Sequence, residues 1–187
     1  MGSTYFTNPI IYLLRIVFEF YLLAIMLRFL LQWIRADFYN PLSQFILKIT
    51  NPPLLPLRKI IPGYGGVDLA ALLLMLAVAL LQFLLISLIS GFMPSAALLL
   101  ARSVADLLEL FLNIFFFSIL IQVVLSWVAP QHYNPITVLI HQLNEPLLRP
   151  VRRILPPMGG FDFSPLVVIV LIQMSKMILL PPLYTIS

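Results

Sequence analysis

The sequence predicts an all-α membrane protein of four transmembrane helices in two parallel repeats, each with an amphipathic interfacial helix and a proline-rich loop. Three observations carry this prediction. Hydrophobic residues make up 61% of the 187 residues, and charged residues only 10%. Four stretches stay apolar over the roughly 20 residues that a helix needs to cross a bilayer. The chain also repeats itself, without a gap, at an offset of 94 positions.

Composition excludes several classes of protein. A soluble domain carries about 25% charged residues, so this chain lacks the polar side chains to cover itself in water. It has no cysteine, which excludes disulfides and thiolate metal sites. The net charge of +4 on so apolar a chain favours contact with anionic lipid head groups rather than with nucleic acid.

The four apolar stretches set the domain organisation. We expect helices over residues 10–34 and 69–90, a third that starts between residues 95 and 107 and ends at 127, and a fourth over 165–180. Pro181 and Pro182 should end the fourth helix. A turn at residues 91–94 divides the chain into repeat 1 (residues 1–94) and repeat 2 (residues 95–187).

The duplicated unit connects the first helix to the second and the third to the fourth. Between residues 33–72 and 127–166, 15 of 40 aligned positions are identical. These identities are dense in tryptophan, proline, glycine and charge, which indicates a duplicated structural unit. The motif positions that we expect to be structural are Trp33, Asn40, Pro41, Pro56, Gly66 and Asp68, and then Trp127, Asn134, Pro135, Pro150, Gly160 and Asp162.

Each copy begins with Asn-Pro, a signal for the start of a helix. The asparagine can cap the helix, and proline fits its first turn, where no amide proton is needed. Apolar residues follow at i, i+3, i+4 and i+7, which predicts a short amphipathic helix in the membrane interface. They are Leu42, Phe45, Ile46 and Ile49 in the first copy, and Ile136, Leu139, Ile140 and Leu143 in the second.

The second half of each copy predicts a break. The prolines of residues 52–56 should end the interfacial helix and leave one short turn at residues 57–61. Gly65 and Gly66 can form a tight turn, and Asp68 and Asp162 can cap the second and fourth membrane helices.

Basic residues predict the orientation. Seven of them lie in the two repeat loops, and none lies in the amino terminus, the 91–94 turn or the carboxyl tail. By the positive-inside rule, both loops face the cytoplasm, both termini lie outside, and Trp33 and Trp127 lie at the cytoplasmic interface. Each repeat crosses twice, so the copies should share one orientation about an axis along the membrane normal.

Two tandem copies of W-x(6)-NP-x(10)-P-x(3)-P-x-R-[KR]-x(2)-P-x(2)-GG-x-D between helix pairs resemble the YggT family, over essentially the whole chain. The resemblance implies a small integral protein of the bacterial inner membrane or the plastid membrane. It also implies a role in osmotic or potassium homeostasis, in cell division, or in cofactor assembly. The family has no catalytic residues to carry over.

The first candidate site is the basic pair that follows the prolines in each copy. It consists of Arg58 and Lys59 in repeat 1, and of Arg152 and Arg153 in repeat 2. These side chains could bind lipid phosphates or an acidic cytoplasmic protein, or they could simply fix the orientation of the loop. Their repetition at one offset from proline favours more than an orienting role.

The second candidate site is a set of charges inside the predicted membrane helices: Arg15, Glu19, Arg102, Asp106 and Glu109. A charge in the bilayer costs several kcal/mol unless it is paired. Arg15 with Glu19, and Arg102 with Asp106, have i, i+4 spacing. The repeat offset also places Arg15 on Glu109, which predicts an interhelical ion pair across the axis. A structural ion pair is the favoured interpretation of Glu19, with an ion or proton path as the alternative.

Two further charges lie in these helices. Arg28 is close enough to the cytoplasmic end of its helix to extend toward the head groups, and Lys176 lies in the fourth helix.

No residue pattern predicts enzymatic chemistry. The chain has no nucleophile beside a base, and His132 and His141 have no carboxylate at ligand spacing, so we expect no metal and no cofactor. The sequence favours a non-enzymatic protein of ion or osmotic homeostasis, or alternatively a membrane scaffold that recruits cytoplasmic partners. Expected partners are anionic lipids; a homo-oligomer and a cytoplasmic protein are left open.

Overall fold

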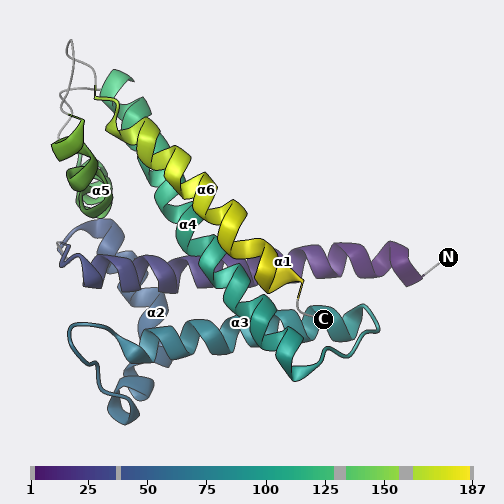
Figure 1. Cartoon of the computed structure of the whole chain (residues 1–187). Coiled ribbons are helices and arrows are strands. Elements are labelled where there is room, and N and C mark those ends of the chain that lie inside the picture. Colours follow the sequence, from purple (N-terminus) through teal and green to yellow (C-terminus); the bar gives the residue numbers. More distant parts are fainter. Residues whose placement is uncertain (1–2, 37–38, 129–133, 156–161, 186–187) are drawn as a thin grey trace.

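The computed structural model describes residues 3–36, 39–128, 134–155 and 162–185, and these residues form six helices (Figure 1). In chain order the helices are α1 (Ser3–Trp33), α2 (Pro41–Ile60), α3 (Leu69–Ile89), α4 (Ala96–Val128), α5 (Pro135–Ile154) and α6 (Ser164–Tyr184).

Four of these helices are long and apolar enough to cross a membrane. The spans are Asn8–Trp33, Leu69–Ile89, Ala96–Trp127 and Ser164–Tyr184, which confirms the predicted number of transmembrane helices. The predicted end of the last helix is wrong, because α6 continues through Pro181 and Pro182 to Tyr184. Tyr184 hydrogen-bonds to carboxylates on α4, and this tertiary contact holds the last turn in place.

The predicted helix caps form at three of the four sites. Asn40 and Asn134 accept the amides of Leu42 and Ile136, each at 3.0 Å, and a proline follows each asparagine. Asp68 caps α3 by accepting the Ala71 amide at 3.2 Å. At α6 the cap position is Phe163, and Asp162 lies one residue outside it.

The predicted break at the prolines does not occur. The helix α2 is continuous from Pro41 to Ile60 through Pro52, Pro53 and Pro56, and α5 likewise contains Pro146 and Pro150. Each internal proline removes one backbone hydrogen bond, so these helices need support from packing. That support comes from side chains of α1 and α4, which hydrogen-bond to α2 and α5 beside the prolines.

The apolar stripe of α2 is divided between the interior and the surface. Ile46 is buried, and Leu42, Phe45 and Ile49 remain 37%, 60% and 38% exposed in the isolated chain. The buried side chains of α2 are Ser43, Ile46, Thr50 and Leu54. The helix therefore presents a half-polar stripe to the other helices and leaves its apolar stripe free for lipid or another surface.

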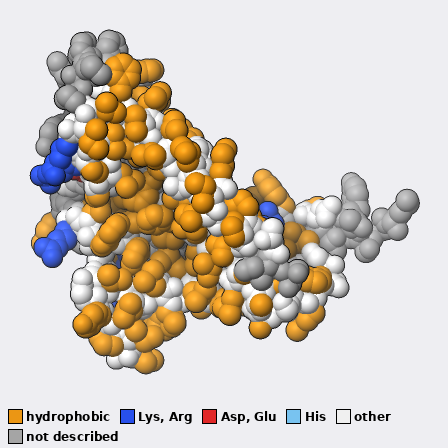
Figure 2. All heavy atoms as spheres, in the orientation of Figure 1, with side chains coloured by type: hydrophobic (Ala, Val, Ile, Leu, Met, Phe, Trp, Pro, Cys, Tyr) orange, Lys and Arg blue, Asp and Glu red, His pale blue; other side chains and the backbone are white. Residues whose placement is uncertain are grey.

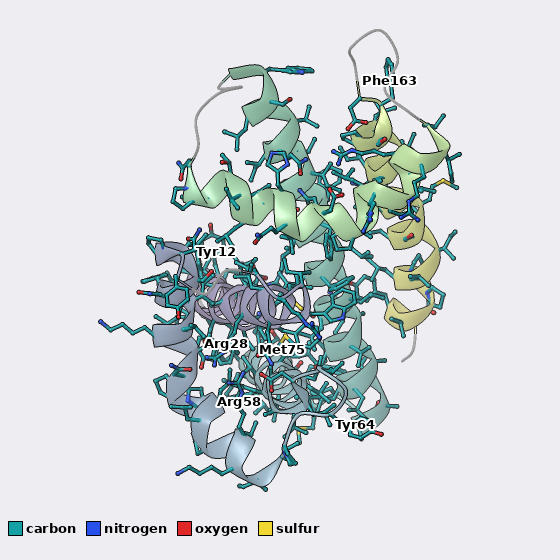
Figure 3. All side chains as sticks on the ribbon, turned by 90° about the vertical axis from the view of Figure 1, so that its left-hand side faces the viewer. Tyr12, Arg28, Arg58, Tyr64, Met75 and Phe163 are labelled. Carbon is teal, nitrogen blue, oxygen red and sulfur yellow. The ribbon has the colours of Figure 1, made fainter. Side chains whose placement is uncertain are left out.

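The two repeats pack in the same pattern. Within each repeat the two membrane helices lie side by side, α1 along α3 and α4 along α6, while α2 packs on α1 and α5 on α4. Both connecting helices lie at one end of the molecule, and the described parts of both termini lie at the other (Figure 1), as expected for repeats of one orientation. In Figure 3 the helix α5 crosses over α4 and α6.

One buried apolar cluster joins the repeats. Its largest fully buried side chains include Ile25 and Leu30 of α1, Met75 of α3 and Ile119 of α4.

The outer surface is also apolar, and Figure 2 shows hydrophobic side chains over most of one face, with Lys and Arg gathered toward the α2–α5 end. The α4–α6 pair is inclined to the α1–α3 pair (Figure 1).

Candidate functional site

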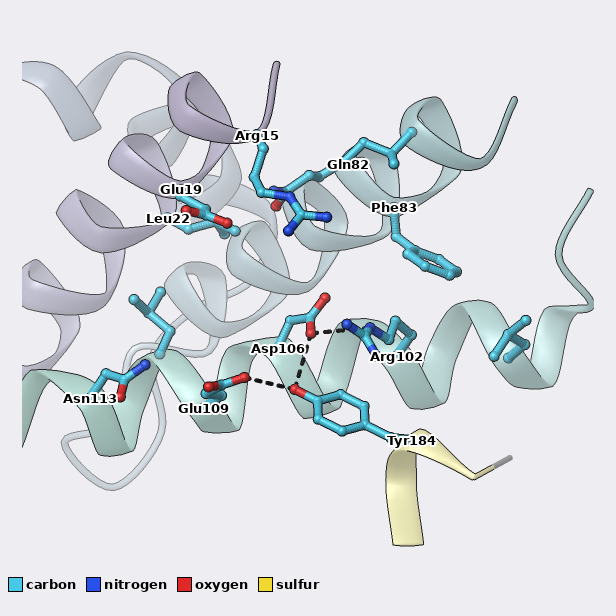
Figure 4. Close-up of a pocket in the computed structure, with 13 residues that line it drawn as sticks. Arg15, Glu19, Leu22, Gln82, Phe83, Arg102, Asp106, Glu109, Asn113 and Tyr184 are labelled. Atoms are coloured by element: carbon cyan, nitrogen blue, oxygen red, sulfur yellow. Dashed lines mark hydrogen bonds and ion pairs between the residues drawn. The ribbon is translucent and has the colours of Figure 1, made fainter. Parts of the chain in front are cut away.

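A polar pocket of about 460 Å³ lies between the two repeats. Its walls come from the middle of α1, the end of α3, the first half of α4 and the end of α6 (Figure 4). No residue of α2 or α5 lines it. The five charged candidates that the sequence predicted in the membrane helices all line it. They are Arg15, Glu19, Arg102, Asp106 and Glu109.

The α4 wall of the pocket is a connected set of charges. Arg102 pairs with Asp106 through Nε and Oδ1 at 3.3 Å, which confirms the predicted i, i+4 contact. The Tyr184 hydroxyl donates to Glu109 at 2.8 Å and lies 3.3 Å from Asp106. The Arg102 guanidinium lies 4.1 Å above the Tyr184 ring, a distance that suits a cation–π contact.

Lys176 extends this set into α6. Its ammonium donates to Asn113 Oδ1 at 2.5 Å and lies 3.9 Å from Glu109 Oε1. Because its side chain is only 16% exposed, the nearby carboxylate is the charge that offsets its burial.

The α1 wall is different, because neither of its charges forms an ion pair with another described residue. In Figure 4 the side chains of Arg15 and Glu19 point from α1 toward α4. Neither takes part in the ion pairs of the described residues. The predicted ion pair between Arg15 and Glu109 is therefore wrong, because Glu109 is engaged by Tyr184 and Lys176 instead.

The basic pairs of the connecting helices divide into two kinds of side chain. Arg58 is hydrogen-bonded to Asp68, with its Nε at 3.2 Å, and also to Gln32 at 2.9 Å. Arg152 repeats the contact with Asp162 at 2.9 Å and adds Glu145 at 3.1 Å. In both copies the arginine thus links the end of a connecting helix to the start of the next span. This contact explains why an arginine follows proline at the same position of each repeat, without an external ligand.

The second residue of each pair remains free to act elsewhere. Lys59 and Arg153 are exposed, and binding to lipid phosphates or to a partner stays a prediction for them.

The ion pair with Arg152 affects the pKa of the Asp162 carboxyl. Partial burial raises its pKa, but the hydrogen bonds from the Ser164 amide and from Arg152 outweigh burial and hold the pKa below its usual value.

A buried contact between α1 and α2 was missed by the sequence reasoning. Arg28 is only 3% exposed and donates to Thr50 Oγ1 and Asn51 Oδ1, each at 2.7 Å. The expectation that Arg28 extends toward the head groups is therefore wrong. Two neutral oxygens on α2 satisfy part of the guanidinium and fix α2 against α1.

Repeat 2 has an equivalent contact built from amides. Asn144 of α5 is fully buried, donates to Gln122 Oε1 at 2.8 Å, and accepts from Ser118 at 2.6 Å. Gln122 and Asn144 lie 94 positions after Arg28 and Thr50. A polar pair in the same position of both repeats was the signal that could have revealed this contact.

The remaining described motif residues lie at helix starts, at helix ends and in a turn. Asn40 donates to the Pro135 carbonyl at 2.7 Å and so links the starts of α2 and α5. Gly66 has φ of +85°, as the predicted turn requires. Trp33 and Trp127 are exposed near the ends of α1 and α4. Gly160 and His132 lie outside the described residues.

Comparison with known proteins gives one consistent result. A family model described as CCB3/YggT matches residues 7–89 and again residues 101–183, a displacement of 94 positions. An uncharacterised protein of Pseudomonas aeruginosa is 46% identical over 172 residues, which cover 91% of this chain and 87% of that protein. A protein of Escherichia coli strain K12, named uncharacterised protein YggT, is 37% identical over 174 residues, which cover 91% and 88%. No solved structure matches.

Proposed function

Because the chain belongs to the CCB3/YggT family, we propose that it is a non-enzymatic, multi-pass protein of the bacterial inner membrane that supports ion or osmotic homeostasis. The observation that carries the proposal is the pocket between the repeats. Charged side chains in membrane helices are costly and mark solute or ion pathways more often than other surfaces do. Here five of them line one pocket.

The electrostatics of the pocket favour binding of a charged solute. Its lining charges are two arginines and three carboxylates, and the Glu19 carboxylate is not ion-paired within the described residues. Membrane helices surround the pocket on several sides, so its charges interact more strongly with a bound ion than charges at a water-exposed surface do. Potassium is the cation that the proposal tests first.

The test is ion flux in vesicles that contain the purified protein. We expect potassium efflux above that of empty vesicles, and we expect Glu19→Gln to reduce it. Lys48→Gln is the matched control, because Lys48 is an exposed residue of α2 outside the pocket. Wild-type vesicles that are no more permeable than empty ones would contradict conduction by this chain alone.

The second candidate function is a scaffold that recruits cytoplasmic partners. It is favoured by one observation: α2 and α5 lie at the same end of the molecule and expose Lys59 and Arg153 there (Figure 1). This role places both connecting helices on the cytoplasmic side and the termini outside. Co-purification of a cytoplasmic protein that is lost in the Lys59→Glu, Arg153→Glu double variant would favour it over conduction.

A further inference from the structure

We propose that the pocket between the repeats binds a small zwitterion, with its acid group on Arg15 and its ammonium group on Glu19. This inference rests on the proposed function, because it names the class of solute that the same pocket takes. It starts from two charges on α1 that line the pocket and that take part in no ion pair of the described residues.

Arg15 and Glu19 carry opposite charges, which restricts the ligands that can neutralise both. A bound cation alone would neutralise Glu19 but would leave Arg15 without a counter-ion and would repel it. A bound anion alone would do the reverse. A ligand that carries both charges can pair with both side chains at once, and both side chains are exposed at the pocket.

Arg15 and Glu19 are four residues apart on α1, so they lie one helical turn, or about 6 Å, apart along the helix axis. Small zwitterions carry their two charges at a comparable separation. The pocket volume of about 460 Å³ falls in the usual range for small-molecule sites.

On the opposite wall, Arg102 and Asp106 pair with each other, and Glu109 is held by Tyr184 and Lys176. These contacts pair the charges of the α4 wall with one another or with α6. The two charges of the α1 wall are not paired with another described residue. The ligand is therefore expected to bind mainly to α1, with polar contacts to Gln82 and Asn113, which also line the pocket.

The two arginine–aspartate pairs keep their chemistry across the 94-residue offset, as Arg58 and Arg152 or Asp68 and Asp162 show. Pocket positions do not: Arg15 aligns with Glu109, Glu19 with Asn113, and Gln82 with Lys176. The first set explains a shared fold, whereas the second makes a single asymmetric pocket that can orient a ligand with two different ends.

A zwitterion can reach this pocket as a free solute or as the head group of phosphatidylethanolamine. The experiment has an arm for each source. In the first arm, titration calorimetry on detergent-purified, lipid-depleted protein compares γ-aminobutyrate with butyrate and butylammonium, which match it in size and carry one charge each. In the second arm, native mass spectrometry counts the phosphatidylethanolamine and phosphatidylglycerol molecules retained from mixed nanodiscs.

We expect γ-aminobutyrate, or phosphatidylethanolamine, to bind at least about ten-fold more tightly than its singly charged counterpart. We expect Arg15→Gln and Glu19→Gln each to remove about ten-fold or more of that affinity, because each deletes one charge-assisted contact. Lys48→Gln should leave binding unchanged. The swapped variant Arg15→Glu, Glu19→Arg should still bind, since the ligand can turn round, and this result separates binding from a structural role.

Equal binding of the singly charged compounds, or no binding in either arm, would overturn the proposal. So would a swapped variant that folds normally but no longer binds. Potassium flux without zwitterion binding would refute this inference and leave the proposed function standing. Zwitterion binding without potassium flux would support this inference and refute the proposed potassium pathway.

Discussion

The two arginine–aspartate clamps offer a matched measurement of what burial does to an ion pair. Arg58 and Arg152 are equally exposed at 32%, but the Asp68 side chain is 3% exposed and that of Asp162 is 30%. The perturbation is Asp→Asn at each site. At position 68, asparagine can cap α3 about as well as aspartate. At position 162, one residue outside the cap position of α6, it can still accept the Ser164 amide. Each substitution therefore removes the charge and largely preserves the local hydrogen bond.

The expected magnitudes follow from burial. Removing one partner of a buried ion pair costs about 3–5 kcal/mol, because the other charge is left without compensation. Since Arg58 is one-third exposed, we take the lower end and expect about 3 kcal/mol for Asp68→Asn. Arg28 adds to this cost, because it is buried close to the same carboxylate. For Asp162→Asn we expect about 1 kcal/mol or less, the usual value of an exposed pair.

The assay is reversible unfolding of the purified protein in mixed micelles, followed by circular dichroism. The double variant Arg58→Gln, Asp68→Asn provides the control, and it should be less destabilised than Asp68→Asn alone because no orphan cation remains at position 58. Equal losses at Asp68 and Asp162 would refute the reasoning, since burial would then not decide the cost.

Three further predictions use the same assay. Asn144→Leu should lower the free energy of unfolding by about 1–3 kcal/mol for each partner left unsatisfied in the buried contact with Ser118 and Gln122; an unchanged midpoint would contradict a role for that contact. Arg28→Gln should destabilise the chain, and adding Thr50→Asn should recover part of the loss by copying the polar pair of repeat 2. A double-mutant cycle that gives no coupling energy between positions 28 and 50 would argue that the two contacts are not equivalent. The clamp of Asp162 should weaken in acid. Its folded pKa lies below the unfolded value of about 3.9, so its contribution is present above that value and is lost as the pH falls through the folded pKa, a loss that Asp162→Asn should abolish.

The sequence was sufficient for the architecture because membrane helices are specified by composition and length. Four spans, two repeats and the asparagine caps at Asn40 and Asn134 all follow from patterns that act over a few neighbouring residues. The helix breaks could not be predicted in the same way. Pro52, Pro53 and Pro56 signal a break locally, but packing of α2 against α1 outweighs that preference.

The pocket contains the five predicted candidate charges, but their pairing differs from the prediction. Arg15, Glu19, Arg102, Asp106 and Glu109 all line it, because a charge in a span has few places to go except an interior surface. The choice of partner depends on Tyr184 and Lys176, which reach Glu109 from α6. Those contacts depend on how α6 packs along α4, and no local sequence pattern encodes that packing.

The duplication itself contains a signal that residue-by-residue inspection misses. Arg28 alone looks like a charge near a membrane surface, and Gln122 alone looks like an isolated amide in a span. Aligned at the 94-residue offset, they become one position that is polar in both copies, and Thr50 with Asn144 becomes another. Two such positions, one on a span and one on its connecting helix, predict a hydrogen bond between them, because neither polar group can remain unpaired in an apolar setting. Both contacts are present, with different chemistry in each repeat. In this duplicated chain, the two positions that stay polar while their residue type changes, Arg28/Gln122 and Thr50/Asn144, therefore mark a contact between a span and its connecting helix.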